Sequence, residues 1–200
     1  MIRFVELGRA IFFLAVLPCL LTLGCRAPRG ATAEQEVAHA GRLYDKGDYA
    51  GAAAGYEQAA RLDSGSLPAR IGLGSSLLAL QRYDEARQAY EEAARLHPED
   101  PWPYFGLGQV ETLTGRPEQA LAAYREFARR KPGDPNAQGR IGRALHALGR
   151  FPEAVLAFER AEAIDPRYFT CGCRPSEHAL LRDARQRAAS STTDPATPTK

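Results

Sequence analysis

A strict internal repeat of thirty-four residues constrains this chain more than any other feature. Gly108 recurs as Gly74 one period earlier and as Gly142 one period later, with Ala40 in the same phase of the first unit. Four more sets keep this period: Leu73, Leu107 and Ile141 with His39; Ala52, Ala86, Ala120 and Ala154; Tyr56, Tyr90, Tyr124 and Phe158; and Pro98, Pro132 and Pro166 with Ser64 as the departure. The units run 33–66, 67–100, 101–134 and 135–168 without insertions, which is typical of stacked-repeat architectures.

Each unit is predicted to form two amphipathic helices. In the third unit, apolar residues recur at helical spacing on both sides of a turn at 114–116. Pro117 suits a first helical position because it has no amide hydrogen to lose. We expect the two helices to cross closely at Gly108 and Ala120, and the ring of Tyr124 to fill the space that these small residues leave. One unit cannot bury its apolar face alone, so stacking of neighbours supplies a continuous core.

The repeat resembles the tetratricopeptide repeat (TPR), a helix–turn–helix unit of this length, over about two-thirds of the chain. The resemblance implies an all-α fold, a right-handed superhelical α-solenoid of four repeats with a C-terminal capping helix. It also implies a protein–protein interaction scaffold, which binds a protein or peptide partner in its concave groove. Nothing in the sequence names that partner.

Motifs and charge agree with a binding protein that is not an enzyme. The sequence shows no Ser–His–Asp order, no phosphate-binding loop and no paired carboxylates in a recognisable context. We assign no catalytic residue, no cofactor and no metal. The formal net charge of +2 gives no electrostatic reason to expect nucleic acid, and the hydrophobic content of 44% is enough for a sizeable core.

The resemblance also implies which residues face the groove, because the first helix of each unit lines it in this family. The residues predicted by phase are Tyr44, Ile71, Leu78, Trp102, Phe105, Gln109, Arg143 and His146, with Val37, Gly41, Ser75, Thr112 and Asn136 at further groove positions. This set puts apolar and aromatic side chains at the centre and Arg143 and His146 at one end. Some family members clamp a C-terminal carboxylate with Lys and Asn. No such clamp is expected, since Val37, Ile71 and Phe105 stand at those positions.

Two alternatives stay open for the groove residues. Ile71, Leu78 and Phe105 could instead pack between helices, because periodicity alone does not separate groove from core. Trp102 lies between Pro101 and Pro103 at a predicted helix start, where it could pack onto the preceding unit.

Residues 1–24 are predicted to be a signal peptide. Arg3 and Arg9 precede an apolar region at 10–23 that is too short, and broken by Pro18, to span a membrane comfortably. The segment ends in Gly24-Cys25 and resembles a bacterial lipoprotein signal, although Thr22 stands where that signal usually has leucine. The resemblance implies a lipidated N-terminus at Cys25 with a linker (25–32), and an exported, membrane-anchored protein that faces the periplasm or the cell exterior. Such proteins serve in assembly of envelope complexes. Ordinary secretion, with cleavage near 31–33, is the alternative.

The C-terminal region, 169–189, is predicted to hold a Cys-Gly-Cys turn and a capping helix from Glu177 to Ala189 with Ser176 as its N-cap, followed by a disordered tail at 190–200. Three alternatives stay open for Cys171 and Cys173 in an oxidising compartment. They could bond to each other in a tight turn, form a disulfide-linked homodimer, or bind metal with His178, which gives three ligands where structural zinc takes four. These cysteines motivate an alternative function, a redox- or metal-linked accessory protein in an exported maturation pathway.

Overall fold

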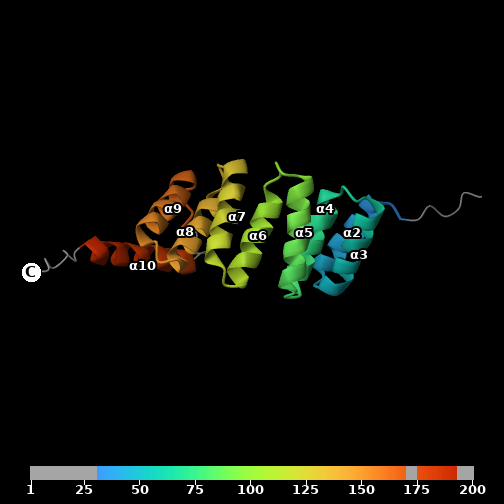
Figure 1. Cartoon of the computed structure of the whole chain (residues 1–200), viewed down its shortest axis with the longest axis horizontal. Helices are drawn as coiled ribbons and strands as arrows, with labels where there is room; N and C mark the ends of the chain where they lie inside the picture. Colours follow the sequence, from blue (N-terminus) through green and yellow to red (C-terminus); the bar gives the residue numbers. More distant parts are fainter. Residues whose placement is uncertain (1–30, 170–174, 193–200) are drawn as a thin grey trace, which may run out of the picture. The chain divides into compact units, whose positions relative to one another are not determined.

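The computed structural model describes residues 31–169 and 175–192. Within these ranges nine α-helices and no strands occur, all in the second of two compact units, Ala33–Lys200. They form four pairs and a last helix: α2 (Ala33–Asp45) with α3 (Tyr49–Leu62), α4 (Leu67–Ala79) with α5 (Tyr83–Leu96), α6 (Trp102–Leu113) with α7 (Pro117–Arg130), α8 (Pro135–Ala147) with α9 (Phe151–Ile164), and α10 (Pro175–Thr192). Consecutive helices pack on one another (Figure 1), so the predicted all-α solenoid of four repeats is confirmed.

Capping residues and prolines explain where several of the helices begin. The side chains of Asp48, Ser66 and Asp134 accept a backbone N–H in the first turns of α3, α4 and α8. Pro117 begins α7, as predicted. Local capping and proline therefore mark where these four helices begin.

The turn inside each pair needs a left-handed backbone at one position. Gly47, Gly115 and Gly149 have φ values of 81°, 71° and 71° there, and the second unit has Gln81 at 60°. A Cβ atom makes this conformation costly by about 1–2 kcal/mol per residue. Gln81 is thus the one strained turn of the four.

We expect Gln81→Gly to raise the free energy of unfolding by about 0.5–1 kcal/mol, because glycine removes the strain but adds freedom to the unfolded chain. Urea denaturation measures the change. The matched control is Gln88→Gly, the same substitution on the exposed face of α5, which should instead destabilise by about 1 kcal/mol. A loss of stability in both variants would contradict the expectation.

The core is organised by aromatic rings that lie against glycines. A Cβ on Gly108 would approach the ring of Tyr124 to 2.4 Å, so even a methyl group is too large there. The expectation of a small residue at Gly108 is confirmed, and the atoms that require it belong to the ring. Tyr90 lies between Gly74 of its own unit and Gly106 of the next, with Cβ approaches of 2.8 and 2.3 Å. Tyr90 therefore packs across two adjacent units.

Tyr90 is deeply buried, and burial raises the pKa of its phenol to about 12, although a hydrogen bond with the Ser75 hydroxyl at 3.0 Å acts in the opposite direction. The phenol is therefore neutral at physiological pH.

A buried ion pair, which was not predicted from the sequence, joins α5 to α6. Arg87 Nε donates to Glu111 Oε1 at 2.6 Å, and the Glu111 side chain is only 8% exposed. Arg116 lies 3.6 Å from the other oxygen of Glu111, and Arg87 also donates to Asp84 at 2.7 Å. At the position of Glu111 the other three units carry leucine, namely Leu43, Leu77 and Leu145. A charged residue at this apolar position was the signal in the sequence that could have indicated a buried ion pair.

The capping helix α10 begins two residues before the predicted Glu177 and ends three residues after Ala189. Ser176 consequently lies inside the helix and is not its N-cap. The buried face holds Glu177, Leu181 and Ala184, spaced at i, i+4 and i+7. Tyr168 donates to Glu177 Oε2 at 2.8 Å, so a buried polar contact adds to the apolar packing of this face.

Several predictions fall outside the described residues, namely the signal peptide, Cys25, the pair Cys171 and Cys173, and the tail from 193 onward. These stay predictions. Across 31–169 and 175–192, no helix combines the length and the apolar character needed to cross a bilayer.

Candidate functional site

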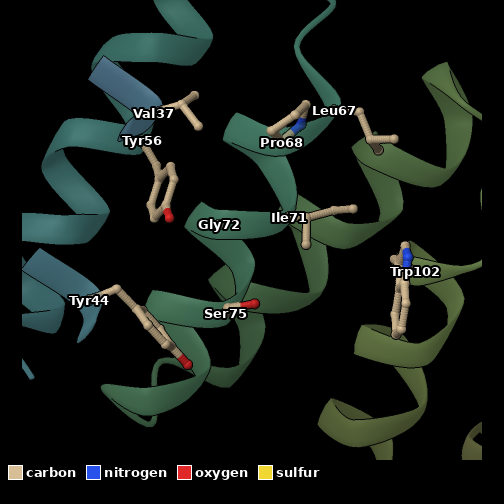
Figure 2. Close-up of a pocket in the computed structure, with 9 residues that line it drawn as sticks. All are labelled: Val37, Tyr44, Tyr56, Leu67, Pro68, Ile71, Gly72, Ser75 and Trp102. Atoms are coloured by element: carbon tan, nitrogen blue, oxygen red, sulfur yellow. The ribbon is translucent and has the colours of Figure 1, made fainter. Parts of the chain in front are cut away.

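One groove follows the first helices of the first three units. It has a volume of about 550 Å³. Its lining, drawn in Figure 2, consists of Val37, Tyr44, Tyr56, Leu67, Pro68, Ile71, Gly72, Ser75 and Trp102. Three residues of the predicted set, Tyr44, Ile71 and Trp102, thus lie in one groove although they come from three different units.

Figure 2 shows Tyr44 and Tyr56 on one side of α4 and Trp102 on the other, with Ile71 between them. Tyr56 comes from the second helix of the first unit, at the position equivalent to Tyr90 and Tyr124, and was not among the residues predicted to face the groove. It is only partly buried, however, because its ring borders the open groove. Burial, then Asp45 and Tyr44, raise the pKa of the Tyr56 phenol, which therefore stays a neutral hydrogen-bonding group.

Trp102 is held at the start of α6 with much of its ring open to the groove. Its side chain is 45% exposed. The ring packs on Phe127 at 5.8 Å between centroids, and Lys131 Nζ lies 4.5 Å from the ring centre. Both contacts come from the same unit, so Trp102 is anchored on its own α7. A rigid, half-exposed indole of this kind is the side chain most enriched among binding hot spots.

Phe105 was predicted to face the groove, but its side chain packs beside the core. Its ring contacts Phe127 and Tyr124, at 5.1 and 6.1 Å between centroids, and it is partly buried beside the core. It lines none of the hollows described here. The position corresponds to the alternative in which Phe105 packs between helices.

The remaining predicted residues lie in two smaller hollows further along the first helices. Leu78, Gln109 and Arg143 line one of about 140 Å³. Arg143 and His146 line another of about 420 Å³, together with Leu180 of α10. The eight predicted residues are therefore distributed over three hollows and one packing position.

Helix α10 engages the residues that the sequence placed at the basic end of the groove. His146 Nε2 lies 2.6 Å from Asp183 Oδ2, and Arg143 Nη1 lies 3.9 Å from Glu177 Oε1. Hydrogen bonds from Arg187 and His146 lower the pKa of the Asp183 carboxyl, so this acid is ionised at neutral pH. The sequence could not show this closure, because α10 lies outside the repeat and has no phase relation to α8.

The chemistry of the groove favours binding. Its walls are aliphatic and aromatic, with hydroxyls from Tyr44, Tyr56 and Ser75 as the polar groups. Among the residues the structure describes, no three His, Cys, Asp or Glu side chains gather as a metal site would require. The redox- or metal-linked alternative rests on cysteines outside these ranges and stays a prediction.

Comparisons with known proteins fit this architecture. Two family models described as "Tetratricopeptide repeat" match the chain, one over 105–168 and the other over 43–104 and 77–126, which together exceed half of its 200 residues. A search of the curated proteins found no match.

Similar solved structures include MamA (41-end) from Desulfovibrio magneticus RS-1, with a TM-score of 0.65, 18% identity, and coverage of 83% of this chain and 99% of that one. They also include YrrB, described as "a TPR protein with an unusual peptide-binding site", with a TM-score of 0.60, 22% identity, and coverage of 80% and 88%. At these identities the likeness shows the fold alone.

Proposed function

Because the chain belongs to the tetratricopeptide repeat family, we propose that it is a protein-interaction scaffold that binds an apolar peptide segment of a partner in the groove of Tyr44, Ile71 and Trp102. The observation that carries the proposal is the half-exposed Trp102 ring in a groove of about 550 Å³. Burying such an aromatic anchor against a partner is a common source of binding energy. The peptide-binding site that the description of YrrB mentions supports a ligand of this class.

Trp102 is the only tryptophan of the chain, so its fluorescence is an intrinsic probe of binding in the groove. We expect peptides selected on the full chain from a phage-displayed library to carry aromatic or aliphatic residues and to shift the Trp102 emission. Tyr44→Ala should then weaken binding about tenfold, since an aromatic wall of the groove is lost. Trp102→Ala should weaken peptide binding at least as much. Because this variant lacks the tryptophan, its affinity is measured by calorimetry.

The matched control is Leu62→Ala, which truncates a similarly exposed apolar side chain at the end of α3, outside the groove. It should leave the affinity unchanged. Selected peptides that bind Tyr44→Ala and Trp102→Ala as tightly as the parent chain would rule the groove out.

We further propose that the scaffold is exported and held at a membrane by lipid on Cys25, for assembly of an envelope complex. The support is the N-terminal sequence, with its short apolar region before Gly24-Cys25. A lipid chain anchors a protein to a membrane without a spanning helix. Mass spectrometry should find a mature chain that begins at an acylated Cys25, and Cys25→Ser should release the protein from the membrane fraction. A mature N-terminus near Ala33 would instead indicate ordinary secretion.

A further inference from the structure

Two hollows on the face of the second helices lie in the same register of the repeat, two units apart. The first, the acidic hollow, has a volume of about 420 Å³ between α3 and α5. The second, the basic hollow, has about 280 Å³ between α7 and α9. Neither shares a residue with the groove of Tyr44, Ile71 and Trp102.

The floors of the two hollows are alike. Leu73, Leu77 and Ala89 in the acidic hollow correspond by the repeat to Ile141, Leu145 and Ala157 in the basic one. Each hollow also borders an internal ion pair at the same position, Arg82 with Glu85 and Arg150 with Glu153. The repeat has therefore built a depression with the same apolar floor twice.

The charges beside these floors are opposite. Glu57 and Glu92 flank the acidic hollow, and the equivalent positions of the basic hollow are Arg125 and Arg160. The glutamate side chains remain 58% and 48% exposed, although Oε1 of Glu57 accepts from Arg61 and Oε1 of Glu92 from Arg70. Arg125 and Arg160 are exposed and form no ion pair within the described ranges. Two carboxylates on one hollow thus occupy the repeat positions that two guanidinium groups occupy on the other.

The rim of the basic hollow also carries an exposed apolar side chain. Leu156 is 54% exposed, whereas the equivalent position of the acidic hollow is the polar Gln88. A leucine projecting beside two arginines is complementary to a depression with an apolar floor and two glutamates.

We propose that two copies of this chain associate through these hollows, with Leu156 of one copy seated in the acidic hollow of the other. Arg125 and Arg160 then pair with Glu57 and Glu92 of the second copy. Because each copy carries both hollows, a twofold arrangement makes the contact twice, as closed dimers do. The groove stays uncovered in both copies, so the dimer presents two peptide sites and gains avidity for a repeated partner.

Sedimentation velocity tests the contact on the full chain in mild detergent and reducing buffer, which prevents links through Cys171 and Cys173. The wild-type chain should sediment as a dimer that weakens as salt increases, since exposed charge pairs are screened. Arg125→Glu with Arg160→Glu should raise the dissociation constant at least tenfold, and so should Glu57→Arg. Glu92 is left unchanged, because the buried Arg70 depends on it.

Mixing the two charge-reversed proteins distinguishes this contact from a general loss of association. The arginine-reversed and Glu57→Arg chains should each be monomeric alone but form a heterodimer together. One of its two contacts joins the unaltered acidic hollow of the first chain to the unaltered basic hollow of the second, so the substitutions burden only the other contact. Leu156→Gln, which copies the equivalent Gln88, should also weaken the dimer. Arg182→Glu reverses the charge of one exposed residue of α10, away from both hollows, and should have no effect. A monomeric wild-type chain, a dimer that survives both reversals, or a mixture that stays monomeric would overturn the proposal.

Discussion

Glu111→Leu is expected to lower the free energy of unfolding by about 3 kcal/mol, although it places an apolar residue where the other units carry leucine. The substitution leaves the Arg87 guanidinium largely buried, with Asp84, which is mostly exposed, as its remaining partner. The Arg87 side chain is only 16% exposed, so water has little access to replace the lost carboxylate. Urea denaturation measures the loss.

The double variant Arg87→Leu with Glu111→Leu should recover most of that stability or exceed the wild type. Leu121 already occupies the position equivalent to Arg87 in the third unit, and Leu77 the position equivalent to Glu111 in the second. Replacing a whole buried pair with apolar residues is often neutral or stabilising, because two desolvated charges disappear together. The double-mutant cycle should therefore show strong coupling.

An exposed pair provides the control for this cycle. Arg185 and Glu159 also join two helices, α10 and α9, but both side chains are about half exposed. Glu159→Ala should cost less than about 1 kcal/mol, as exposed ion pairs do. Additive effects of the Arg87 and Glu111 substitutions would show that the pair does not act as a unit.

Gly106→Ala is expected to destabilise the protein by about 2 kcal/mol, even though alanine is the better helix former. The added methyl group would lie 2.3 Å from the ring of Tyr90. That ring cannot retreat, because Gly74 bounds its other side and its hydroxyl is hydrogen-bonded to Ser75. The strain falls on the interface between the second and third units, on which the stability of a stacked-repeat protein depends.

Gly72→Ala is the matched control, with the same change one unit earlier. Its methyl group would lie 2.4 Å from the ring of Tyr56, but Tyr56 borders the open groove and can swing aside. Thermal unfolding should show a much smaller loss for Gly72→Ala than for Gly106→Ala. Equal losses would mean that the ring of Tyr90 yields as readily as that of Tyr56.

The candidate site could be predicted from the sequence only in part. The phase of the repeat predicted Tyr44, Ile71 and Trp102 for the groove side of their first helices, and all three line one groove. They hold the twelfth, fifth and second positions of their units, which lie on one side of a helix because they are spaced at near-helical intervals. It could not show that Phe105 turns toward Phe127 and Tyr124, since a groove position and a packing position differ by a fraction of a helical turn. Tyr56 was missed for the converse reason, because its ring borders open space in the first unit.

The sequence by itself determined the four helix pairs and the packing of rings against small residues. Apolar spacing, prolines and glycines act within one unit, and the same pattern is repeated with the same phase. Only the tertiary structure decided how α10 engages His146, how Glu111 is buried beside Arg87, and how two equivalent hollows acquire opposite charges. These features depend on contacts between side chains of different units or of α10, at positions where the units differ. The repeat marks such positions, but it does not show which side chains meet there.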